Sequence, residues 1–374
     1  MSRIPLCRAL IEDEELQAVE AVLKSGWLTH GPKNIEFENL FASYLGVKHA
    51  IAMNSCTSAL FLAVVANNIK GDVLLPSFTF VASANAIVTA GARPVFADIS
   101  YDDCNIDASL LEKALTPHTE ALMVVHYAGQ CCDMRAISEF ARKHKLLLIE
   151  DSAETIGGTY EGKMSGNWGI GCFSFFPTKN ITTGEGGMFT TNDDTLAEHV
   201  RALIGHGIKK TTAERVSEGK AWYREASYPG YNFRLSNILA TLGVEQMKKL
   251  DNMNSLRRQH SAYLIDKLKD VSEISTPVEK PGRQHVYQMF TIKVRKPGSR
   301  DGLVRYLKER EIEASVHFDP PVHLHAAYKD VCKAVLPVTE TVSSSIVTLP
   351  MFPQLTKKEL DTIACAIKDY FSAG

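Results

Sequence analysis

The 374-residue sequence has no excess charge of one sign, no long apolar run and no paired cysteines. Its 41 basic and 43 acidic side chains nearly cancel, and no basic cluster stands out, so nucleic-acid binding is not expected. No apolar run approaches the length of a membrane span, and the first residues lack the apolar core of a secretory signal. We therefore expect a cytoplasmic protein without a membrane segment.

Motifs for disulfides, nucleotides and metals are also missing. The eight cysteines show no CxxC spacing, and adjacent Cys131 and Cys132 have poor geometry for a mutual bridge, so reduced thiols are expected. There is no GxGxxG at the first strand–helix junction and no P-loop pattern. The histidines at 317, 323 and 325 lack a carboxylate or cysteine at suitable spacing, so no metal site is expected.

Strand-like and helix-like segments alternate through the first part of the chain. Apolar runs are separated by helical patterns near 57–67, 80–90, 107–115 and 133–144. The apolar runs themselves lie near 49–53, 72–75, 93–97, 121–125 and 145–149. This alternation predicts an α/β fold with a mostly parallel central sheet and helices on both faces, in which ligands bind beyond the carboxyl ends of the strands.

Helical patterns flank this region on both sides. An amphipathic helix is expected near 12–24, with Leu16, Val19, Val22 and Leu23 on one face, and another near 33–45. After about residue 232, the pattern predicts helices near 236–250 and 251–270, a strand at 288–294, and helices near 300–310 and 357–370. We expect a large domain over 1–248 and a smaller C-terminal α+β domain over 249–374.

The segment 149–188 carries most of the chemical signal. Asp151 ends an apolar run, and Lys179 lies in SFFPTKNITTGEGG with no other lysine or arginine nearby. The carboxylate could keep a pyridine nitrogen protonated, and desolvation of the lysine would lower its pKa and favour the nucleophilic amine. An acid and a lysine of this kind suit pyridoxal phosphate (PLP). The structural alternatives are a solvated lysine and an acid that caps a helix.

Hydroxyl groups near a predicted helix start form a second constellation. The sequence NSCTS at 54–58 lies between a strand and a helix, where backbone amides and hydroxyls could hold a phosphate. Plain helix capping by Ser55 or Thr57 is the alternative. Ser174 is a further hydroxyl near Lys179, and Phe80 could either stack on a planar ring or belong to the core.

Taken together, these segments resemble the DegT/DnrJ/EryC1/StrS family of sugar aminotransferases, which are PLP enzymes of fold type I. The resemblance extends along essentially the whole chain. The segments that carry it include GWLTHGPKNIEFENLFASYLG, NSCTSALFLA, PSFTFVASANAI, VVHYAGQCCDM, the IEDSAE to EGGM block and YNFRLSNILATLGVEQM.

The resemblance implies a role for each matching residue at the cofactor. Lys179 would bind PLP covalently, and Asp151 would pair with the ring nitrogen. Phe80 would stack on the ring, and Glu154 would lie near its 3-oxygen. The hydroxyl groups that would bind the phosphate are those of Thr57, Ser58 and Ser174.

Further residues are implied at the subunit boundary and at the substrate. Asn232, in YNFRLSN, would reach the phosphate from the neighbouring subunit, which implies a homodimer with composite active sites. Other residues match segments that line the entrance for the sugar nucleotide. These are Trp27, Thr29, His30, His317 and His323.

The implied reaction transfers an amino group from L-glutamate to a nucleotide-linked keto sugar. The segment TKNITTGEGG is typical of members that act on 4-keto sugars. Glu154 and Phe176 resemble the residues of perosamine synthases, which favours a GDP-linked 4-keto-6-deoxy sugar over a UDP- or dTDP-linked one. The alternatives are a 3-keto sugar aminotransferase, a pyridoxamine-phosphate-dependent sugar dehydratase, and a non-catalytic regulatory relative. The dehydratases carry histidine in place of the lysine, so Lys179 argues against that alternative.

Overall fold

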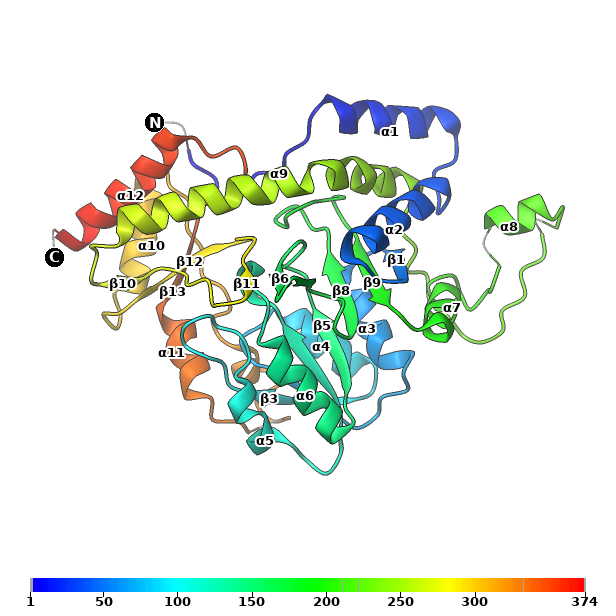
Figure 1. The fold of residues 1–374 in the computed structure, drawn as a ribbon, viewed down its shortest axis with the longest axis horizontal. Coiled ribbons are helices and arrows are strands. Elements are labelled where there is room, and N and C mark those ends of the chain that lie inside the picture. The colour runs from blue at the N-terminus through cyan, green and yellow to red at the C-terminus, as the bar shows by residue number, and fades with distance from the viewer. Residues whose placement is uncertain (1–2, 211, 221, 332, 373–374) are drawn as a thin grey trace.

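A large central sheet organises the computed structural model, which describes residues 3–210, 212–220, 222–331 and 333–372 (Figure 1). Within these residues the sheet has seven strands, and β9 runs antiparallel to both of its neighbours while the remaining pairings are parallel. Their order is β1 (His49–Met53), β9 (Gly187–Thr191), β8 (Ile170–Ser174), β5 (Leu147–Asp151), β4 (Thr119–Val125), β2 (Asp72–Pro76) and β3 (Arg93–Ala97). The predicted α/β fold with a mostly parallel sheet is confirmed.

Both faces of this sheet are covered by helices, because successive strand residues point to opposite sides. Leu75 and Met123 belong to a core that includes α3 (Cys56–Val65) and α4 (Val81–Thr89). Leu74 and Leu122, one residue earlier in each strand, belong to another core with α6 (Met134–His144). Burial on both faces explains why these strands read as continuous apolar runs.

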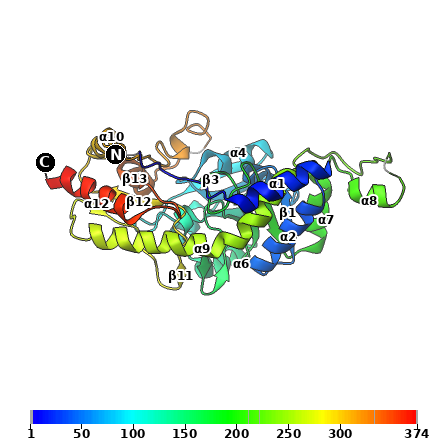
Figure 2. The same ribbon diagram turned by 90° about the horizontal axis from the view of Figure 1, so that it is seen from above.

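One long helix, α9 (Asn237–Leu268), replaces the two helices predicted for 236–250 and 251–270. Its 32 residues correspond to about 48 Å of helix. The residues around 250–251 include no glycine or proline, so nothing breaks the helix there. Figures 1 and 2 show α9 lying along the long axis of the molecule, where it contacts α1 (Asp13–Ser25), α2 (Pro32–Leu45) and α12 (Lys357–Ser372).

The apolar face of α1 is only partly buried within the chain. Leu16 is 61% exposed and Leu23 is also exposed, whereas Val22 is buried. Buried Glu15 instead connects α1 to α9, because its Oε1 accepts a hydrogen bond from Gln246 Nε2 at 2.7 Å. Polar contacts therefore replace much of the apolar packing that the periodicity indicates.

The C-terminal part forms the predicted α+β layer. Antiparallel strands β10 (Ile274–Ser275), β12 (Phe290–Val294) and β13 (Ile346–Leu349) share a core with α10 (Arg300–Glu309) and α12. The predicted boundary between residues 248 and 249 falls inside α9 and stays a prediction.

Smaller elements complete the described chain, in which no helix has the length and apolar character needed to cross a membrane. Figure 1 shows α8 projecting from the body on the segment that follows α7. The remaining helices and strands are α5 (Leu111–Ala114), α7 (Asp194–Leu203), α8 (Thr212–Ser217), α11 (Pro337–Ser345), β6 (Thr159–Tyr160), β7 (Lys163–Met164) and β11 (Arg283–Gln284).

Candidate active site

A cavity of about 390 Å³ lies beyond the carboxyl ends of β4, β5 and β8. The last residues of these three strands line it, as do the first turns of α3 and α4 and segments of the C-terminal part. Parallel sheets bind ligands at this edge. The predicted site residues that line the cavity are Thr57, Phe80, Asp151, Glu154, Ser174, Lys179 and His317.

Asp151, the last residue of β5, is a buried carboxylate that is 5% exposed. Its Oδ2 accepts a hydrogen bond from Ser83 Oγ at 2.8 Å, and its Oδ1 accepts one from the Ala153 amide at 3.2 Å. Burial raises the pKa of Asp151, while these two hydrogen bonds act to lower it. In the described residues no lysine, arginine or histidine forms an ion pair with it, so its environment suits a cationic ligand group.

Lys179 lies in the loop between β8 and β9 and pairs with a different acid. Its Nζ is 3.3 Å from Glu154 Oε1, and both side chains are largely buried. Glu154 Oε2 in turn accepts a hydrogen bond from the Ala128 amide at 2.8 Å. The amine is thus held beside a carboxylate inside the cavity.

The start of α3 provides a place for an anion. Ser55 caps this helix and accepts a hydrogen bond from the Ser58 amide at 3.1 Å, whereas amides in a first helical turn lack intrahelical acceptors. A Cβ on Gly187 would lie 2.4 Å from the Cys56 nitrogen, so β9 packs directly against this turn. The hydroxyl groups of Thr57 and Ser174 belong to residues on the cavity wall.

Two phenylalanines at the cavity are more exposed than core residues. Phe80, at the start of α4, is 64% exposed, and Phe176 is also exposed. The alternative that Phe80 belongs to the core is therefore wrong. Its ring is available to a planar ligand.

Several predicted residues do not line the cavity in this chain, so their roles stay predictions. The Ser58 hydroxyl donates to Asn54 Oδ1 at 2.7 Å. His323 Nδ1 is hydrogen-bonded to Ser77 Oγ at 2.7 Å. Burial, with Arg201 and Arg234 nearby, lowers the pKa of His30 to about 4. The predicted site residues that do not line the cavity are Trp27, Thr29, His30, Ser58, Asn232 and His323.

The sequence reasoning missed two residues of the site. Ser83 lies one helical turn after Phe80, so its position on the predicted 80–90 helix could have indicated it. Gln288 lines the cavity and donates from Nε2 to the Thr178 carbonyl at 2.8 Å. No local pattern around Gln288 indicates this long-range contact.

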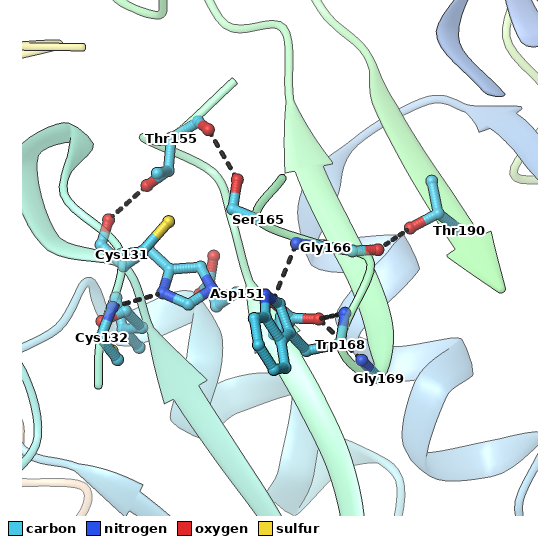
Figure 3. Close-up of polar contacts among 12 residues, drawn as sticks. Cys131, Cys132, Asp151, Thr155, Ser165, Gly166, Trp168, Gly169 and Thr190 are labelled. Atoms are coloured by element: carbon cyan, nitrogen blue, oxygen red, sulfur yellow. Dashed lines mark hydrogen bonds and ion pairs between the residues drawn. The ribbon is translucent and has the colours of Figure 1, made fainter. Parts of the chain in front are cut away.

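A buried polar network supports the strand that carries Asp151 (Figure 3). His126 Nδ1 accepts from the Cys132 amide at 3.0 Å, so the proton of the neutral ring is on Nε2, which faces Glu150 Oε2 at 3.0 Å. Glu150, directly before Asp151, also accepts three backbone amides at 2.7–2.8 Å, from Gly166, Trp168 and Gly169. A carboxylate with four donors fixes the end of β5 against its neighbours.

The residues around this cavity fit PLP. A buried carboxylate without a cation could hold the ring nitrogen, the amine of Lys179 could bind the aldehyde, and the first turn of α3 could hold the phosphate. The exposed ring of Phe80 completes this set of contacts.

Comparisons with known proteins agree over nearly the whole chain. Residues 9–368 match the DegT/DnrJ/EryC1/StrS aminotransferase family. The chain is 39% identical to the spore coat polysaccharide biosynthesis protein SpsC of Bacillus subtilis, over 98% of this chain and 96% of SpsC.

Solved structures show the same similarity. DesV of S. venezuelae is 31% identical with a TM-score of 0.91, covering 99% of both chains. DesI, solved in the presence of its TDP-sugar product, is 26% identical with a TM-score of 0.89, covering 98% of this chain and 92% of DesI. Solved relatives also include PLP and PMP forms. The chain therefore belongs to the DegT/DnrJ/EryC1/StrS aminotransferase family and is a PLP-dependent sugar aminotransferase.

Proposed function

We propose that this enzyme transfers the amino group of L-glutamate to the C4 keto group of a nucleotide-linked 4-keto-6-deoxy sugar. The products are 2-oxoglutarate and a nucleotide-linked 4-amino sugar. The observation that carries the proposal is that Lys179 and Asp151 line one cavity. The TDP-sugar product of DesI supports a nucleotide-linked substrate. The 4-keto position and the preference for a GDP-linked, perosamine-type sugar rest on the sequence resemblance.

Lys179 is proposed as the catalytic base and acid. When bound, PLP supplies an electrophilic aldehyde and an electron-withdrawing ring, which make the carbon next to a bound nitrogen acidic. Lys179 then removes a proton from the α-carbon of glutamate and later returns one to the sugar carbon. Glu154, 3.3 Å from Nζ, keeps the amine inside the cavity during both transfers.

Asp151 is proposed to hold the protonated ring nitrogen. Burial raises the pKa of the carboxyl group, and a cationic ring nitrogen beside it would lower that pKa again. The Ser83 hydroxyl and the Ala153 amide keep the carboxylate oriented. Asp151 would thus maintain the charge that makes the ring electron-withdrawing.

Contributions from a second subunit are part of the proposal. Asn232 would reach the phosphate of the neighbouring subunit, so the enzyme would be a homodimer with composite sites. Trp27, Thr29, His30, His317 and His323 would contact the sugar nucleotide. A cytoplasmic location is proposed as well, in keeping with the free state of each described cysteine.

A substrate panel tests the proposal. GDP-, UDP- and dTDP-linked 4-keto and 3-keto sugars are incubated with L-glutamate and the enzyme, and the products are identified by mass spectrometry and NMR. A 4-amino sugar, formed fastest with the GDP-linked substrate, is expected. Amination of 3-keto sugars alone would overturn the C4 assignment, and loss of water without gain of nitrogen would indicate a dehydratase. Lys179→Ala is the control and is expected to give no product.

A further inference from the structure

Asn254 of α9 bridges two loops that meet at the cavity. It is 6% exposed, and its Oδ1 accepts a hydrogen bond from Asn180 Nδ2 at 2.6 Å. Its Nδ2 donates to the Ile156 carbonyl at 3.0 Å. Asn180 directly follows Lys179, and Ile156 lies two residues after Glu154. One amide group therefore contacts both the loop of the lysine and the loop of the acid.

This bridge is the main polar connection between the two loops. Within the described residues, the hydrogen bond from Lys179 Nζ to Glu154 Oε1 is the one direct polar contact from loop 176–184 to loop 152–158. The backbone packs tightly against the bridge, because a Cβ on Gly157 would lie 2.6 Å from Asn254 Nδ2. Gly157 also has a φ of +88°, which a residue with a side chain rarely adopts.

Two other amide side chains contact the lysine loop without contacting the acid loop. Gln288 Nε2 donates to the Thr178 carbonyl at 2.8 Å, and Gln246 Oε1 accepts from the Thr182 amide at 3.3 Å. Neither has a hydrogen bond to loop 152–158 in the described part of the chain. Asn254 differs from both because it fixes one loop relative to the other.

We propose that Asn254 is a positioning residue that sets the separation between Lys179 Nζ and the Glu154 carboxylate. The inference rests on the proposed catalytic role of Lys179. A lysine that transfers protons must approach its partner atoms closely, and small displacements reduce such rates strongly. Asn254 belongs to a continuous helix, so it gives both loops the same fixed reference.

The test compares Asn254→Ala, Asn180→Ala and the double variant in the PLP-loaded enzyme. Asn252→Ala is the matched control, because Asn252 is an exposed asparagine of the same helix. For each protein, kcat, KM for L-glutamate, thermal stability and the visible absorbance of the bound cofactor as a function of pH are measured. If Asn254→Ala does not fold, Asn180→Ala and Asn254→Ser test the same bridge.

We expect each single variant to lower kcat about tenfold, with KM changed less than about twofold. Adding Asn180→Ala to Asn254→Ala should lower kcat little further, because Asn254→Ala already removes the hydrogen bond that the two side chains share. The pH midpoint of the absorbance change should fall in Asn254→Ala, since a more distant Glu154 carboxylate stabilises a cation less. Asn252→Ala should match the wild type.

Three results would overturn the inference. These are multiplicative kcat losses in the double variant, a kcat loss with an unchanged absorbance midpoint, and an Asn254→Ala enzyme whose only change is lower thermal stability. Borohydride trapping of PLP in the wild type separates this inference from the proposed function. A failure to label Lys179 would refute the role of that lysine, whereas an unchanged Asn254→Ala enzyme with labelled Lys179 would refute only the positioning role.

Discussion

At the residue scale, Asp151 illustrates how a functional group can cost stability. Its carboxylate is buried and forms no ion pair with another described residue, and burial raises its pKa above the ordinary value. A carboxyl group whose pKa is higher in the folded than in the unfolded protein binds protons more tightly when folded. Its contribution to stability is therefore greatest at low pH and is lost as the pH rises from about 3.9, the unfolded pKa, through the folded pKa.

Asp151→Asn should consequently stabilise the cofactor-free protein at pH 7 while it impairs catalysis. The amide keeps an acceptor for Ser83 or Ala153 but avoids the buried charge. The reaction barrier should rise by about 3 kcal/mol, roughly a hundredfold in kcat, because a neutral amide does not hold the ring nitrogen protonated. Thermal unfolding of cofactor-free protein at pH 4 and 7 checks the first part, and steady-state kinetics check the second. A lower melting temperature than wild type at pH 7 would contradict the burial argument.

The site residues differ in how far the sequence alone could locate them. Asp151 stands out because it ends a strand, and Lys179 because its segment contains no other cation. Both features are local in the sequence, and both residues line the cavity. Gln288 is far from them in sequence, so only the packing of β12 beside the lysine loop places it there. His30 and Asn232 were identified by resemblance alone, and this chain's own cavity does not include them.

At the element scale, the contact between β9 and the first turn of α3 should determine cofactor affinity. A Cβ at Gly187 would lie 2.3 Å from the Ser55 carbonyl carbon, and backbone atoms there can yield only if the whole turn moves. Gly187→Ala should weaken PLP binding by more than about tenfold, because the amides of that turn would shift from the phosphate. Titration of the cofactor-free protein with PLP measures this affinity.

Gly162→Ala provides the control for that experiment. Gly162 has a positive φ, of +78°, but no atom lies within 4 Å of its added Cβ. The strain should lower stability by about 1 kcal/mol and leave PLP affinity unchanged. Equal affinity losses in the two variants would show that a general loss of stability, rather than displacement of the α3 turn, is responsible.

The packing of α2 against the sheet gives a second element-scale prediction. Phe41 is fully buried, and its ring centroid lies 4.9 Å from that of Phe173 and 5.6 Å from that of Phe175. Phe41→Ala should lower the free energy of unfolding by about 3–5 kcal/mol through the lost burial and the cavity that remains. Leu40→Ala, at a partly exposed neighbour, should cost less than about 1 kcal/mol. Denaturant titrations of both variants check the difference.

Elements with a strong local pattern were predictable, and those set by tertiary contacts were not. The apolar runs of β2, β4 and β5 indicated the parallel sheet because both of their faces are buried. The break predicted inside α9 was wrong because Asp251 and Asn252 are simply exposed residues of one continuous helix. The polar contact that holds α1 was not predictable, because the partner of Glu15 lies on α9, more than two hundred residues away.

At the scale of the whole molecule, the proposed homodimer predicts that two copies of the chain associate in solution. Trp222 is 78% exposed on the segment that carries α8, and Leu16 and Leu23 are exposed on α1. A second copy of the chain could cover some of these apolar side chains. Light scattering should give a mass twice the 41.3 kDa of the chain at micromolar concentration. A mass equal to one chain would contradict both the homodimer and the composite active site.

Borohydride reduction followed by peptide mass spectrometry shows which lysine of the enzyme is covalently attached to PLP. PLP-loaded enzyme is reduced, digested and searched for a lysine that carries the reduced cofactor. We expect this lysine to be Lys179. The Lys179→Ala variant should carry no label, whereas Asp151→Asn should still carry the label on its lysine. Attachment to any other lysine in the wild type, or no attachment at all, would contradict this expectation.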